Sequence, residues 1–145
     1  MSLVSLENVR KTYQSGEILV QALKEINLKI QEKTFVSFIG PSGSGKSTLL
    51  NILGLLDNQT SGQLFFNGID VSGYNERGRT NLRKTNIGFV FQSFNLIDEL
   101  NVFENVELPL LYQKVTATDR KRRVEEVLER MKISSSAPTN RRQYI

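Results

Sequence analysis

Residues 40–48 constrain the fold of this chain more than any other feature of its sequence. They read Gly-Pro-Ser-Gly-Ser-Gly-Lys-Ser-Thr, with a glycine, four further residues, a second glycine, a lysine and a hydroxyl residue. A compact apolar segment at 34–39 precedes them and an apolar run at 49–56 follows. This order predicts a strand, a glycine-rich loop and a buried helix, which is the context that a phosphate-binding loop requires.

The ligand expected for this loop is a nucleoside triphosphate with Mg²⁺. Gly43 and Gly45 can adopt backbone angles that turn successive N–H groups inward, where the positive end of the next helix also attracts phosphate. Lys46 would supply charge to the β- and γ-phosphates, and the Ser47 hydroxyl is a hard oxygen ligand suited to Mg²⁺. The loop specifies neither the nucleotide nor the reaction, because kinases, GTPases, transport ATPases and helicases share it.

The remaining pattern predicts an α/β protein with an antiparallel strand group at its start. Alternating apolar residues predict half-buried strands at 3–9, 18–20 and 26–30, and further strands are expected at 64–66 and 87–91. The 64–66 strand leads into an Asn67-Gly68 turn. An amphipathic helix is expected around Val124, Val127, Leu128 and Met131, with Thr116 and Asp119 as its capping box.

Composition removes several classes of function. The 145 residues suit one domain, and they include no Cys and no His. Disulfides, thiolate metal sites, serine-protease triads and zinc hydrolysis are therefore excluded. No apolar run approaches the ~18 residues that a membrane-spanning helix needs, and charged residues stand within the first dozen, so we expect neither a membrane span nor a signal peptide.

The net charge of +4 is unevenly distributed. Residues 1–113 carry 10 Lys and Arg against 11 Asp and Glu, whereas residues 114–145 carry 9 against 4. The basic run 120–123 could indicate a nucleic-acid or anionic membrane contact. A solvated helix face is favoured instead, because glutamates share that face and no aromatic residues offer a stacking platform, so no nucleic-acid partner is expected.

Three features beyond the loop resemble the ATP-binding subunits of ABC transporters. Tyr13 lies 27 residues before Gly40, where that family has an aromatic residue that stacks on adenine. Residues 60–68 resemble the family's Thr-Ser-Gly turn and following strand. Residues 87–96 resemble its Q-loop, and residues 104–109 resemble the helix entry that follows. The sequences of these motifs are most similar to those of the lipoprotein-releasing and macrolide-efflux type subfamily, and the resemblance covers residues 3 to about 133.

This resemblance implies roles for individual residues. Gln92 would sense Mg²⁺ and the γ-phosphate, acting with Lys46 in catalysis and with Ser47 at the metal. Alone, Tyr13 would be interpreted as a half-buried aromatic and Gln92 as a solvated strand cap. The residues implied to bind ATP are Tyr13, Gly40, Ser42, Gly43, Ser44, Gly45, Lys46, Ser47 and Thr48.

The resemblance also implies partners. The loop around residues 93–100 would contact a membrane permease subunit, and the intact family member would bind ATP between the protomers of a homodimer. Such a subunit is cytoplasmic and lies peripherally at the inner face of the membrane.

Residues 1–145 are accordingly expected to form an incomplete nucleotide-binding domain. Walker A and the Q-loop are present, but the signature sequence, the Walker B strand and the switch His are absent. Residues 96–99 imitate the end of a Walker B strand but follow the Q-loop directly. Residues 134–145 are atypical, and reading the codons of 138–142 one base later allows Gln-Leu-Thr-Gly-Gly, which suggests a frameshift. A cut expression product or a natural short protein are the alternatives.

ATP binding with little or no hydrolysis is therefore expected. By resemblance, the 34–39 strand would be flanked by strands from the absent part, so marginal stability and self-association are also expected. Two alternatives stay open. One is a small P-loop kinase of the guanylate type, whose loop also begins Gly-Pro-Ser-Gly, and the other is a non-catalytic fragment that docks on a membrane subunit.

Overall fold

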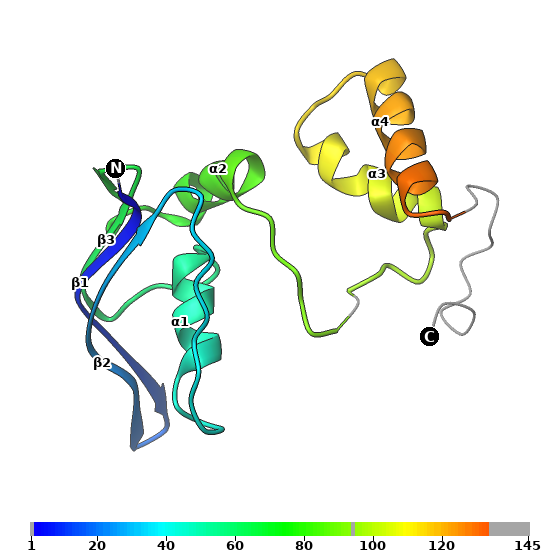
Figure 1. Ribbon diagram of the computed structural model, residues 1–145. Helices are drawn as coiled ribbons and strands as arrows, with labels where there is room; N and C mark the ends of the chain where they lie inside the picture. Colours follow the sequence, from blue (N-terminus) through cyan, green and yellow to red (C-terminus); the bar gives the residue numbers. More distant parts are fainter. Residues whose placement is uncertain (1, 94, 134–145) are drawn as a thin grey trace. The chain divides into compact units, whose positions relative to one another are not determined.

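The structure is a computed structural model that describes residues 2–93 and 95–133 (Figure 1). The chain divides into two compact units, Met1–Ile87 and Gly88–Ile145. Among the described residues, the first unit holds a four-stranded sheet with two helices, and the second holds two helices. No helix among the described residues is both long and apolar enough to cross a membrane.

The sheet of the first unit is antiparallel, with strand order β2-β1-β3-β4. Its two long strands are β1 (Ser2–Ser15) and β2 (Ile18–Gln31), followed by β3 (Ser61–Phe66) and β4 (Ile69–Asp70). The sequence predicted three strands in this part of the chain, but the structure has two, because 18–20 and 26–30 both belong to β2. The predicted turn after β3 is confirmed, because Asn67 and Gly68 both have positive φ, 50° and 77°.

A bulge in β1 changes which side chains face the core. Val4 and Leu6 are buried, but the pairing shifts after Leu6, and the next buried residues are Val9 and Lys11. Asn8 lies at this shift with φ of 50°. An extra residue in one strand reverses the alternation of its faces, so the bulge brings the charged Lys11 side chain to the buried face.

The core of the first unit lies between the sheet and helix α1 (Lys46–Leu53) (Figure 1). Ile52 of α1 is fully buried, and Leu55 just beyond the helix is 1% exposed. Burying apolar side chains from both layers is the main force that holds α1 against the strands. The buried core residues are Val4, Leu6, Val9, Leu23, Leu49, Ile52, Leu55, Leu64, Phe66 and Val71.

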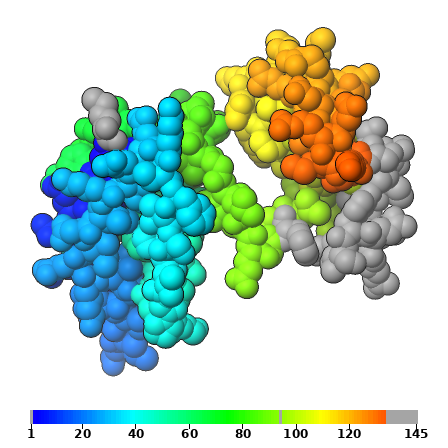
Figure 2. Space-filling view, viewed as in Figure 1, coloured from blue at the N-terminus to red at the C-terminus, as the bar shows by residue number. Residues whose placement is uncertain are grey.

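Two predicted strands are wrong. Residues 34–40 and 87–91 form neither strand nor helix. The side chains of Phe35 and Ile39 are 96% and 93% exposed, and Figure 2 includes this segment (light blue to cyan) in the surface of the first unit. An apolar run predicts burial, but a strand also needs a neighbour for its backbone groups, and the described residues supply none here.

Helix α2 (Glu76–Asn86) was not expected from the sequence, because it is strongly polar. Its start is marked by Asn75, whose side chain accepts a hydrogen bond from the Gly78 amide at 2.9 Å. Arg83 attaches the helix to the core region by donating to the backbone oxygen of Leu55. The helix is thus stabilised by caps and hydrogen bonds more than by an apolar face.

The second unit pairs α3 (Val102–Tyr112) with α4 (Ala117–Arg130). The predicted helix at its end is confirmed, and Thr116 caps it by accepting a bond from the Asp119 amide at 3.4 Å. Its buried face is narrower than predicted, since Val124 and Leu128 are buried while Val127 and Met131 are 42% and 68% exposed.

Candidate phosphate-binding site

The loop before α1 depends on glycine at its last position. Gly45 is the N-cap of α1 and has φ of 87°, a left-handed conformation that side chains disfavour. A Cβ atom there would lie 2.5 Å from the backbone oxygen of Ala22 on β2. Gly43 also has positive φ, 78°, but a Cβ there would meet nothing within 4 Å. The glycines therefore allow both the turn of the loop and its close packing on β2.

Lys46 holds the loop together through its side chain. Its ammonium donates hydrogen bonds to the backbone oxygens of Gly40 at 2.8 Å and Pro41 at 2.6 Å, and to the Ser44 hydroxyl at 3.2 Å. The predicted site residues at the two ends of the loop are thus brought together around one positive charge. A lysine ammonium in this position is a point charge for an anion seated on the loop.

The start of α1 presents amide donors to the same region. The first helical bond beyond the loop runs from the Leu49 amide to the Gly45 oxygen at 2.8 Å, so the amides of Lys46, Ser47 and Thr48 have no helical partner. No side chain caps this end, and no acidic residue stands in the first turn. Free amides, a helix dipole and a lysine together fit a phosphate chain.

The residues present also fit a phosphate-bound Mg²⁺ ion better than a protein-bound one. Ser47 offers an exposed hydroxyl at the start of α1. Among the described residues, no group of three or more acidic or histidine side chains could hold a metal ion. Mg²⁺ prefers oxygen ligands and commonly keeps waters and substrate phosphates among them, so Ser47 would complete such a set.

A cluster around Asp57 was not predicted from the sequence, although Tyr13 was identified there as a candidate binding residue. The Tyr13 hydroxyl donates to Asp57 Oδ2 at 2.8 Å, and the Lys11 ammonium donates to Asp57 Oδ1 at 2.6 Å. Partial burial raises the pKa of the Asp57 carboxyl, but the hydrogen bonds from Lys11, from Tyr13 and from the next backbone amide outweigh this and lower its pKa overall.

Gln92 belongs to the second unit, and its side chain is exposed. The loop that follows is fixed locally, since Asn105 of α3 accepts from the Ile97 amide at 2.9 Å and donates to the Leu100 oxygen at 2.9 Å. The capping box formed by Asn101 and Glu104 then starts α3. Residues 96–99 are loop and turn, so the imitation of a Walker B strand is not a strand.

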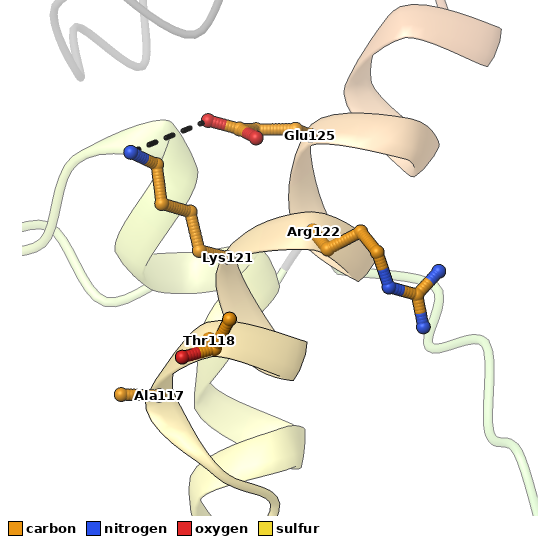
Figure 3. A pocket seen from close by; sticks show the side chains of 5 residues that line it. All are labelled: Ala117, Thr118, Lys121, Arg122 and Glu125. Carbon is orange, nitrogen blue, oxygen red and sulfur yellow. Dashed lines mark ion pairs between the residues drawn. The ribbon is translucent and has the colours of Figure 1, made fainter.

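A shallow surface depression lies on α4, away from the predicted site residues in sequence (Figure 3). In the close-up, Lys121 points toward Glu125, with 4.0 Å between the charged atoms, while Arg122 points the other way. Arg122 contacts Asp119 at 3.4 Å and Glu126 at 3.6 Å. The basic run 120–123 is therefore partly neutralised by acidic residues of the same helix.

Comparisons with known proteins show the family of this chain. Residues 23–144 match the ABC transporter family. The chain is 46% identical over 132 residues to the ABC transporter ATP-binding protein MJ0796 of Methanocaldococcus jannaschii. The aligned region covers 91% of this chain and 56% of that protein. The chain is also 44% identical over 131 residues to the macrolide export ATP-binding/permease protein MacB of Brucella melitensis. Here the aligned region covers 90% of this chain and 20% of that protein.

A solved structure agrees with the fold. The dimeric structure of MJ0796 in a post-hydrolysis state, bound to ADP and Pi, matches with a TM-score of 0.84 at 44% identity, over 94% of this chain and 60% of that one. The chain thus spans a little over half the length of MJ0796. Since the family match extends over most of its residues, the chain belongs to the ABC transporter family.

Proposed function

We propose that this chain binds Mg·ATP through residues 40–48 and serves as the ATP-binding part of a transporter subunit. The observation that carries the proposal is the start of α1, where Gly45 leaves the first amides uncapped and Lys46 lies over the loop. Backbone donors and one lysine charge suit the β- and γ-phosphates. Ser47 would ligate the Mg²⁺ that bridges them.

We further propose that the isolated chain turns ATP over slowly or not at all. Phosphoryl transfer needs a group that orients the attacking water, in addition to a cradle for the phosphates. Gln92 is our candidate for sensing the γ-phosphate and Mg²⁺, but the sequence contains no His and no Leu-Ser-Gly-Gly-Gln signature. Binding without efficient hydrolysis is the expected behaviour.

A membrane partner is part of the same proposal. The name of MacB describes an ATP-binding and a permease function in one protein, and the MJ0796 structure is dimeric. By this likeness, the loop around residues 93–100 would dock on a permease subunit, and an intact subunit would dimerise at the cytoplasmic face of a membrane. Family membership favours this over a guanylate-type kinase.

The decisive experiment is an equilibrium titration of the purified chain with ATP in the presence of Mg²⁺. Wild type is expected to bind saturably, and Lys46→Ala is expected to lose about tenfold or more in affinity, because a charge-assisted contact to phosphate is removed. Lys29→Ala, an exposed lysine on β2, is the matched control and should bind like wild type.

Three outcomes would contradict the proposal. Equal ATP affinity of Lys46→Ala and wild type would show that residues 40–48 do not bind the nucleotide. Phosphate release at a rate typical of intact transport ATPases would show that the chain is catalytically competent, and phosphorylation of a nucleoside monophosphate would favour the kinase alternative instead.

A further inference from the structure

The side chain of Tyr13 is held by two charged residues, which with it form the cluster that we call the Tyr13 anchor: Lys11, Tyr13 and Asp57. One carboxylate oxygen of Asp57 accepts from the Tyr13 hydroxyl at 2.8 Å, and the other accepts from the Lys11 ammonium at 2.6 Å. Both bonds involve an ionised group, so they are stronger than neutral hydrogen bonds. The phenol is therefore fixed at its polar end.

Lys11 also restricts the ring itself. Its ammonium lies 4.8 Å from the centre of the Tyr13 ring, within the range of a cation–π contact. Lys11 is only 9% exposed, whereas Tyr13 is 41% exposed. The ring consequently has one face toward a buried cation and keeps a large part of its surface open to solvent.

The anchor is tied to the segment that follows α1. The Lys11 ammonium donates to the Asn58 oxygen at 2.6 Å, and the Thr60 amide donates to the Arg10 oxygen at 2.8 Å. The Thr60 hydroxyl also accepts from the Thr12 amide at 3.0 Å. Hydrogen bonds at the successive residues 10–12 of β1 therefore join this strand to 57–60, in addition to the bond from Tyr13 to Asp57.

This segment in turn continues from the end of α1. The amides of Leu56 and Asp57 both donate to the oxygen of Asn51 in α1, at 2.8 and 3.2 Å. Lys46 begins the same helix. The helix whose first turn carries the phosphate loop thus ends beside the carboxylate that holds Tyr13, and one rigid element connects the two.

We propose that Lys11 and Asp57 are positioning residues for Tyr13, which hold its partly exposed ring in place to stack on the base of the nucleotide whose phosphates occupy the loop. The inference rests on the proposed function, because it presupposes that this loop binds a nucleotide. Stacking on a pre-ordered ring costs less conformational entropy than stacking on a mobile one. Loss of the anchor should therefore weaken recognition of the base while leaving phosphate binding intact.

The test compares ATP with inorganic tripolyphosphate, both with Mg²⁺, because only ATP has a base. Asp57→Ala is expected to weaken ATP binding about threefold to tenfold and to change tripolyphosphate binding by less than about twofold. Asp57→Asn keeps an acceptor oxygen and should restore part of the loss. Glu25→Gln removes the ion pair between Arg10 of β1 and Glu25 of β2, outside the anchor, and should behave like wild type.

Tyr13→Phe removes the hydroxyl bond to Asp57 but keeps the aromatic ring and the bond between Lys11 and Asp57. We expect it to weaken ATP binding about twofold to tenfold, with tripolyphosphate unchanged. In a Tyr13→Ala background, Asp57→Ala should cause no further loss of preference for ATP, since a positioning residue acts only through the residue that it positions. A purely structural role of Asp57 would instead weaken both ligands in both backgrounds.

A measurement without nucleotide tests the tether directly. With the hydroxyl-bearing ring carbon of the four tyrosines labelled with ¹³C, the NMR signal missing in Tyr13→Phe identifies Tyr13. Asp57→Ala should shift that signal and leave those of distant tyrosines in place. An unmoved Tyr13 signal, or Tyr13→Phe and Asp57→Ala variants that keep the full preference for ATP, would overturn the inference.

The proposed function fails in a different way. A wild-type chain that binds neither ATP nor tripolyphosphate would overturn it, and with it the stacking role. Equal weakening of both ligands by Lys46→Ala supports the loop, and Tyr13→Ala then decides whether the base is read at this residue. If Tyr13→Ala keeps the wild-type preference for ATP, the inference is overturned while the loop stands.

Discussion

At the scale of single residues, Gly45 couples the phosphate loop to the sheet. Its φ of 87° disfavours any side chain, and a Cβ atom there would lie only 2.5 Å from the Ala22 oxygen. We expect Gly45→Ala to lower the free energy of unfolding by about 2 kcal/mol or more, since left-handed backbone alone costs about 1–2 kcal/mol. Urea unfolding of the variant and wild type measures the difference.

Gly43→Ala separates conformational strain from the steric clash. Gly43 has a similar φ, 78°, but no atom lies within 4 Å of the position that a Cβ would take. We expect Gly43→Ala to lower the free energy of unfolding by only about 1 kcal/mol, the cost of the left-handed conformation. Equal losses in the two variants would show that close packing on β2 does not contribute.

The phosphate loop and the Tyr13 anchor differ in how far the sequence could predict them. The loop lies within nine consecutive residues whose spacing encodes its geometry, so its glycines, lysine and hydroxyl residues could be identified without a structure. Asp57 lies 44 residues from Tyr13, and its contact depends on the bulge at Asn8 that turns Lys11 inward. No local pattern encodes that register.

At the scale of elements, α2 depends on charge in a way that pH can reveal. Hydrogen bonds from Arg83 and Arg79 lower the pKa of Glu76, in the first turn, to about 2. The folded form therefore binds the proton less tightly than the unfolded chain, whose Glu titrates near 4.5. The stabilisation is complete above about pH 4.5 and is lost as the pH falls from there toward 2.

Glu76→Gln tests this dependence. The variant should unfold at lower urea concentration than wild type at about pH 6, and the difference should shrink toward zero as the pH approaches about 2. Other carboxylates titrate equally in both proteins and cancel in the comparison. Glu17→Gln, in the turn between β1 and β2, is the control and should follow wild type at every pH. A constant difference between Glu76→Gln and wild type would exclude titration of Glu76 as its cause.

The helices and strands that were predicted correctly find partners for their backbone groups and apolar faces within the described part of this chain. β1 and β2 pair with each other, and α1 buries its apolar face on their sheet, so the local pattern was sufficient. Residues 34–39 carry the same apolar signal but have no strand partner among the described residues. The sequence pattern missed helix α2 for the opposite reason. Caps and ion pairs stabilise this helix, so its sequence has no apolar periodicity that would predict it.

At the scale of the whole molecule, exposed apolar side chains favour self-association. Phe35 and Ile39 are almost fully exposed, and the backbone between them makes no hydrogen bond to another described residue. Apolar surface next to unpaired backbone groups is a template for pairing with a second chain. We expect the sedimentation coefficient of the purified chain to rise with protein concentration.

A double variant identifies the surface responsible. Phe35→Ser with Ile39→Ser removes the apolar groups without adding charge, so it should shift association to higher concentration while leaving ATP affinity in place, because neither side chain belongs to residues 40–48. Met131→Ser, which removes a single exposed apolar side chain on the second unit, should associate like wild type.

A chain that stays monomeric at all concentrations would show that these exposed residues do not mediate contact. Association that persists in the double variant would assign it to another surface, for which the exposed tip of the β1 and β2 hairpin, with Ile18 and Leu19, is the next candidate.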